Sequence, residues 1–97
     1  SESRLEATER AADLAQASAQ DVLALFASRE PATAQGMIAL ADALERTGRQ
    51  PQAQALVRDW WRTRSFDADQ QSRVLGRWGG LLTLDDHEQR LNMLLLG

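Results

Sequence analysis

Apolar residues recur along the chain at the spacing of one helical face, and the pattern is clearest after residue 32. Gly48 ends the first clear run and Pro51 opens the next, as glycine and proline commonly do at helix ends and starts. Each run places its apolar residues at i, i+3, i+4 and i+7. The runs are Met37, Leu40, Ala41 and Leu44, then Ala53, Leu56, Val57 and Trp60. Two helices joined by a tight turn predict an antiparallel helical hairpin.

Two further helices are predicted toward the end of the chain, on either side of Gly79-Gly80. Asp67 is the expected N-cap of the first, and Thr83 with Asp86 three residues later resembles a capping box for the second. The first places Gln71, Val74, Leu75 and Trp78 along one side. The second runs to about residue 96 and carries the stripe Leu84, His87, Leu91, Leu94 and Leu95. We expect this stripe to face the core, with a half-buried histidine, while Asp86 and Arg90 form an i, i+4 ion pair on the outer side.

The first 30 residues carry a weaker pattern. Residues 2–16 favour a helix with a thin apolar stripe, and residues 19–28 show a second apolar face. These faces comprise Leu5, Ala11, Ala12, Leu14 and Ala15, then Ala19, Val22, Leu23 and Phe26. Ser18 followed by Asp21 is a start signal for the second segment. The sequence leaves open whether the two segments form one long helix or two.

The amino-acid composition favours helices throughout. The 97 residues include 16 Ala and 15 Leu, but one Ile, three Val and five Thr. Alanine and leucine suit helices, whereas β-branched residues favour strands. The length allows one domain over residues 1–97 with one modest core. We therefore predict an all-α fold of five or six short antiparallel helices.

Several classes of function are excluded by composition and motif. The net charge of −3 and the lack of a basic patch argue against nucleic-acid binding, and no apolar run is long enough to span a membrane. No cysteine and one histidine argue against a metal site, and we expect no cofactor. Gly79-Gly80 is followed by Leu-Leu-Thr, which is no phosphate-binding loop. No combination of acid, base and nucleophile is apparent, so we expect this chain not to be an enzyme.

Three tryptophans in 97 residues are the most unusual feature of the chain. The simplest interpretation is that Trp60, Trp61 and Trp78 all pack between short helices. The alternative starts from Trp61, which is rotated by about 100° from Trp60 on the helix. Beside it, three arginines complete a cationic, aromatic candidate interaction surface for an acidic partner or another helix: Arg58, Arg62 and Arg64.

The hairpin resembles one tetratricopeptide-like unit beginning near residue 34. The residues that match the repeat are Met37, Leu40, Ala41, Leu44, Ala53, Val57 and Trp60, with Gly48 in the turn. A helical solenoid needs about three such units to bury its faces. The chain is thus expected to be a fragment of a longer superhelix, with helical hairpins over residues 31–97. A tetratricopeptide-like adaptor for protein–protein interaction is one function that fits.

Residues 52–95 also resemble a run in the non-catalytic helical domain of soluble lytic murein transglycosylases, especially those of alphaproteobacteria. The order of short motifs carries this resemblance. They are Ala55-Leu56-Val57-Arg58, Trp60-Trp61, Arg77-Trp78-Gly79, Leu82-Thr83, Asp86-His87, Arg90-Leu91 and Leu94-Leu95. The resemblance implies a structural role for Trp60, Trp78, Gly79, Asp86, His87 and Arg90.

The resemblance also implies a function and a place in the cell. In that family the helices form a periplasmic scaffold, a ring around a separate lysozyme-like domain that cleaves peptidoglycan with one glutamate. The expected partners are that catalytic domain, further helices and peptidoglycan itself. Glu2-Ser3 lacks the family's downstream motif and is read as coincidence, so no catalytic residue is transferred to this chain.

Two expectations concern the ends of the chain. No signal peptide is recognised, as expected of a mature or excised piece of a longer protein. Leu94–Leu96 close the sequence with a contiguous apolar patch. Such patches seldom stay in water, so we expect the chain to self-associate through them.

Overall fold

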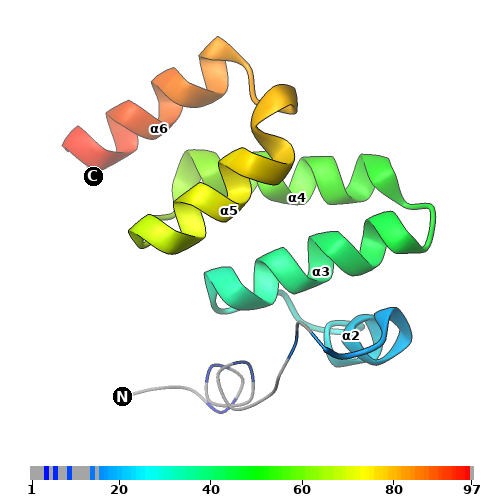
Figure 1. Ribbon diagram of the computed structural model, residues 1–97. Coiled ribbons are helices and arrows are strands. Elements are labelled where there is room, and N and C mark those ends of the chain that lie inside the picture. The colour runs from blue at the N-terminus through cyan, green and yellow to red at the C-terminus, as the bar shows by residue number, and fades with distance from the viewer. Residues whose placement is uncertain (1–3, 5, 7–8, 10–13, 15, 97) are drawn as a thin grey trace. The chain divides into compact units, whose positions relative to one another are not determined.

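A computed structural model describes residues 4, 6, 9, 14 and 16–96, and no strand occurs among them (Figure 1). The described elements are α2 (Ala19–Leu25), α3 (Ala34–Arg46), α4 (Gln50–Thr63), α5 (Ala68–Trp78), the 3-10 helix η1 (Gly79–Leu81) and α6 (Leu84–Leu96). The predicted all-α fold is confirmed. None of the described helices is long and apolar enough to cross a membrane.

The chain divides into two compact units, and the boundary falls inside α4. Unit 1 covers residues 1–53 and unit 2 covers residues 54–97. The expectation of a single domain over residues 1–97 stays a prediction.

In unit 1, α2 packs against α3 around a small apolar cluster. Its buried members are Leu14, Val22, Phe26, Ala39 and Ala43. The side chain of Ser18 accepts a hydrogen bond from the Asp21 amide at 3.1 Å and caps α2. The backbone at Ser18 is extended, so α2 begins at Ala19 as a helix of its own and one continuous helix through this point is excluded. Leu5, Ala11, Ala12 and Ala15 of the predicted first stripe lie outside the described residues.

A tight turn joins α3 to α4 at the predicted glycine. Gly48 has a φ of 78°, in the left-handed region that glycine adopts without steric cost, and the Arg49 amide donates to the Leu44 carbonyl at 2.7 Å. The apolar faces of both helices are largely as predicted. Buried on them are Met37, Ala41, Leu44, Ala53, Val57 and Trp60, with Leu40 and Leu56 half-buried. The antiparallel pairing of these helices stays a prediction.

In unit 2, local polar signals start α5 and α6 where the sequence indicated. Asp67 and Gln70 form a reciprocal capping box at the start of α5. Further along this helix, Val74 and Trp78 are buried. Thr83 does the same for α6: its hydroxyl accepts from the Asp86 amide at 3.2 Å, and its own amide donates to the Asp86 carboxylate at 2.9 Å. Both helix starts could be predicted from the sequence because a capping side chain bonds an amide only three residues away.

The predicted inner side of α6 is wrong. Asp86 and Arg90, expected outside, are 0% and 6% exposed and do not pair with each other. Leu84 and Leu91, expected inside, are 74% and 55% exposed, and His87 is exposed as well. Leu94, Leu95 and Leu96 are 52%, 73% and 86% exposed, as expected of the apolar patch that they form in the sequence. The helix is turned this way because Asp86 and Arg90 find partners on α4, in the segment that follows it and on α5.

Candidate functional site

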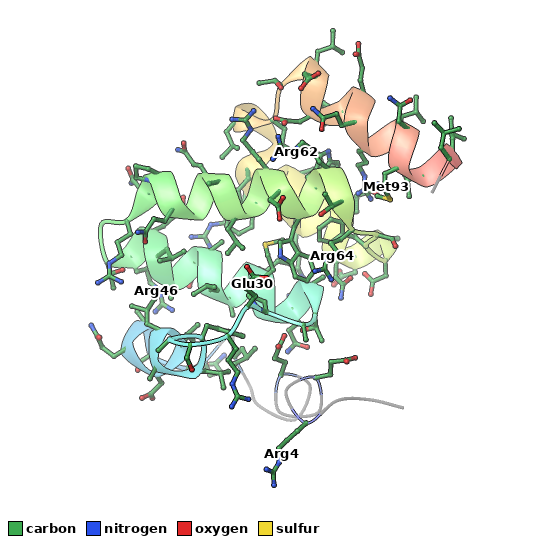
Figure 2. The ribbon with its side chains drawn as sticks, turned by 180° about the vertical axis from the view of Figure 1, so that it is seen from behind. Arg4, Glu30, Arg46, Arg62, Arg64 and Met93 are labelled. Carbon is green, nitrogen blue, oxygen red and sulfur yellow. The ribbon has the colours of Figure 1, made fainter. Side chains whose placement is uncertain are left out.

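Charged and aromatic side chains gather in unit 2 where the C-terminal part of α4 meets α6. Figure 2 shows Arg62 on the side of α4 that faces α6. α4 supplies Arg58, Trp61 and Arg62, while α6 supplies Asp86, His87 and Arg90. We call these six residues the α4–α6 cluster. The cluster includes three of the four residues of the predicted interaction surface.

Asp86 is the fully buried carboxylate at the centre of the cluster. Arg58 binds it with two nitrogens, Nε to Oδ2 at 3.0 Å and Nη2 to Oδ1 at 3.3 Å. Arg62 adds a longer ion pair at 4.0 Å, and the Thr83 amide donates to Oδ2 at 2.9 Å. A two-pronged guanidinium on a carboxylate is among the strong polar contacts in proteins. Asp86 thus ties α6 to α4 while also capping its own helix.

The pKa of Asp86 reflects two opposing effects. Burial disfavours the charged form and raises the pKa, but hydrogen bonds from Thr83 and Arg58 and the Arg58 charge outweigh it. The net result is a pKa below the ordinary 3.8, so the carboxylate stays ionised at neutral pH. A general acid or base works best with a pKa near the working pH. Asp86 is shifted away from that range.

Arg90 closes the C-terminal end of α4 from the other helix. Its Nη1 donates to the carbonyls of Trp61 at 3.0 Å and Arg64 at 2.8 Å, and its Nη2 donates to Gln71 Oε1 at 3.2 Å. The guanidinium also lies over the Trp61 ring, 4.2 Å from its centroid. The last carbonyls of a helix have no partner within it and favour a cation nearby. Burial lowers the pKa of Arg90, but arginine still remains charged at neutral pH.

Trp61 is not a surface residue, and this corrects the predicted interaction surface. Its side chain is 3% exposed, and its Nε1 donates to His87 Nδ1 at 3.2 Å. Arg58 and Arg62 hold Asp86, while Arg64 lies over the Trp60 ring at 4.6 Å. Trp61 is buried because the neighbouring helix α6 covers its ring with His87 and Arg90. The three arginines therefore do not form one free cationic face.

The other two tryptophans follow the simpler interpretation. Trp60 is 6% exposed and Trp78 is 2% exposed, so all three tryptophans are buried. Phe66 lies 6.4 Å from Trp60 and 5.7 Å from Trp61, measured between ring centroids. Gly79 follows Trp78 as the C-cap of α5, with ordinary right-handed backbone angles, and begins η1. Packing between short helices accounts for the tryptophan content of the chain.

Unit 1 holds a second buried carboxylate that the sequence did not single out. Glu9 is 0% exposed and accepts hydrogen bonds from the amides of Ala32 at 2.9 Å and Thr33 at 3.0 Å, and from the Thr33 hydroxyl. It sits over Gly36, where an added Cβ would lie 1.9 Å from the carboxylate oxygen. Glu9 is therefore a distant cap for the start of α3. Its partners lie more than 20 residues away, so no local signal marks it.

The buried polar groups of both units bind other parts of the same fold. Among the described residues, no buried side-chain nitrogen or oxygen lacks a hydrogen-bond partner. The same residues contain no group of three or more His, Asp or Glu side chains placed to hold a metal ion. A fully partnered polar network rigidifies a fold. What this arrangement does is fix α6 on α4 in one orientation, with the leucines outward.

Comparison with known proteins adds no relative. No protein-family model matches the chain, and no curated protein or solved structure matches it either.

Proposed function

We propose that this chain is a non-catalytic helical scaffold that works by packing against another helix. The observation that carries the proposal is the orientation of α6. Its charged residues Asp86 and Arg90 are buried, while Leu84, Leu91 and Leu95 are 74%, 55% and 73% exposed. Exposed leucines gathered on one side of a helix mark a place where another surface binds.

The finer form of the proposal is a scaffold domain of a periplasmic peptidoglycan lytic transglycosylase, placed around a separate lysozyme-like domain. The motif resemblance of residues 52–95 suggests this assignment. Its support here is that the residues of those motifs do structural work: Asp86 and Arg90 tie α6 to α4, and His87 accepts from Trp61. Motifs that describe a way of packing suit a scaffold. In this proposal the glutamate that cleaves glycan belongs to the other domain.

Peptidoglycan sacculi provide the experiment. The purified chain and the product of the complete reading frame that contains it are each incubated with insoluble sacculi. Retention and release of 1,6-anhydro muropeptides are then measured. We expect the complete product to be retained and to release these products, and the chain alone to do neither. Release by the chain alone contradicts a non-catalytic role, and a complete product that neither binds nor cleaves contradicts the transglycosylase assignment.

A protein–protein interaction adaptor is the second candidate, and the leucine face of α6 favours it as well. An adaptor needs a surface that a partner helix can cover, and α6 presents one without further rearrangement. The two candidates differ in the sacculus experiment. Should neither protein bind sacculi, the adaptor becomes the leading proposal.

A further inference from the structure

The outward side of α6 has the spacing of a coiled-coil seam. Successive residues of a helix are about 100° apart, which places Leu84, Glu88, Leu91 and Leu95 on the side opposite Asp86 and Arg90. The steps between these four are i+4, i+3 and i+4, the pattern of heptad a and d positions. Figure 2 shows Met93 on the opposite side of α6, toward the rest of unit 2, and this residue is half-buried. We call Leu84, Glu88, Leu91 and Leu95 the α6 seam.

Glu88 is the one charged member of this seam. It is exposed, between Leu84 and Leu91, and its carboxylate makes no hydrogen bond or ion pair within the part of the chain that the structure describes. A helix laid over the seam removes water from this carboxylate. An ionised group loses several kcal/mol when it is desolvated without a partner, so the covering helix must bring a cation to that position.

A second copy of α6 cannot bring that cation. The basic residues of α6 are His87 and Arg90. Arg90 is 6% exposed and held by the carbonyls of Trp61 and Arg64, and His87 is held by Trp61, whose Nε1 donates to its Nδ1. Two copies paired in parallel and in register place Glu88 against Glu88. Paired antiparallel about the centre of the seam, they place Glu88 against Leu91. Either arrangement leaves a desolvated carboxylate unpaired, which selects against the self-pairing of this face. The self-association predicted through Leu94–Leu96 stays a prediction, and we do not expect it to run along the α6 seam.

We propose that the α6 seam binds an amphipathic helix from outside these 97 residues, one with an apolar heptad stripe and an arginine or lysine opposite Glu88. The inference deepens the proposed scaffold function, on which it rests, by naming the chemistry of the partner. The leucines supply the apolar contact, and the Glu88 pair sets the register and the choice of partner. A single polar position in an otherwise apolar seam commonly has this role.

Designed peptides test this directly. Two fluorescent amphipathic helices of about 20 residues, long enough to hold helical structure, carry the same leucine stripe and differ only in a central arginine or glutamate. Binding to the 97-residue chain is measured by fluorescence anisotropy. We expect the arginine peptide to bind at least about tenfold more tightly than the glutamate peptide. Glu88→Arg should reverse this preference.

A matched variant separates the seam from general attraction between charges. Asp85→Arg makes the same change of charge on an exposed residue one position outside the seam. It should leave the preference of the chain for the arginine peptide in place. Leu91→Asp and Leu95→Asp, each at an exposed position, should abolish binding of both peptides while the circular dichroism of the chain stays helical.

Three results overturn the inference. The first is equal binding of the two peptides or no binding of either. The second is a reversal by Asp85→Arg as complete as that by Glu88→Arg. The third is a dimer of the unmodified chain in sedimentation that Leu91→Asp dissolves, since the occupant is then a second copy. None of these results changes the outcome on sacculi, so failure of this inference and failure of the transglycosylase assignment are distinguishable.

Discussion

Arg58 and Arg73 each pair with an aspartate, but their surroundings differ. The Asp86 carboxylate that Arg58 binds is fully buried, whereas Arg73 and its partner Asp69 are 64% and 74% exposed in their side chains. Water screens the exposed pair and can replace either partner. A buried carboxylate that loses its cation has no such replacement. The value of an ion pair therefore depends on where the chain places it.

Arg58→Ala should lower the free energy of unfolding by about 2–3 kcal/mol, below the range for a pair buried on both sides, because the Arg58 side chain is 41% exposed and Arg62 stays within 4.0 Å of Asp86. Arg73→Ala is the matched control and should cost less than about 0.5 kcal/mol. Urea unfolding of the two variants measures the difference. Equal losses would contradict the buried role of Asp86.

The pH dependence of stability provides a second test at this scale. Because the pKa of Asp86 is lowered in the folded chain, its contribution is complete above the ordinary value of 3.8 and is lost as the pH falls through the folded pKa. The free energy of unfolding of Asp86→Asn should therefore fall less steeply below about pH 4 than that of the unmodified chain. Identical acid limbs in urea unfolding would show that Asp86 is not held ionised by the fold.

At the scale of helices, the sequence predicted the helix starts and the buried faces of α3 and α4, but it did not predict which side of α6 turns inward. Ser18, Asp67 and Thr83 cap their helices because each acts on an amide three residues away. The side of α6 that turns inward depends on Arg58, 28 residues from Asp86. Apolar spacing cannot register a contact of that separation. An apolar stripe indicates a side of the helix that is stabilised by burial, but the surface that buries it need not belong to this chain.

The candidate site, too, could be predicted only in part from the sequence. The sequence brought out Trp61 and the neighbouring arginines as unusual, and most of them do lie in one cluster. It could not show that α6 covers Trp61, because His87 and Arg90 reach it only in the folded chain. Glu9 was missed for the same reason, since the amides of Ala32 and Thr33 that it accepts from are 23 and 24 residues away.

Two glycines within helices separate close packing from helix propensity. A Cβ at Gly36 in α3 would lie 1.9 Å from the Glu9 carboxylate, whereas a Cβ at Gly76 in α5 would meet nothing within 4 Å. Gly36→Ala should destabilise the chain by about 1–3 kcal/mol because the cap must shift. Gly76→Ala should stabilise it by about 0.5–1 kcal/mol. Thermal unfolding compares them, and a stabilising Gly36→Ala would contradict the position of Glu9.

At the scale of the molecule, each unit uses one buried carboxylate to hold its own segments together. Glu9 does this in unit 1 and Asp86 does it in unit 2. In unit 2 this also decides which residues lie on the surface, because α6 exposes its leucines when Asp86 is buried. The proposed scaffold function and the proposed partner helix both depend on this orientation of α6.

The most direct test compares two neighbours in the sequence that face opposite ways. Arg90→Ala leaves the buried carbonyl of Trp61 and that of Arg64 without a donor, which should lower the free energy of unfolding by about 3 kcal/mol. Leu91→Ala removes a side chain from a residue that is 55% exposed and should cost less than about 1 kcal/mol. Urea unfolding of both variants measures which of the two side chains is buried. A larger loss for Leu91→Ala, in the range of about 2–5 kcal/mol for a core leucine, would show that α6 turns its leucines inward and would contradict the buried position of Arg90.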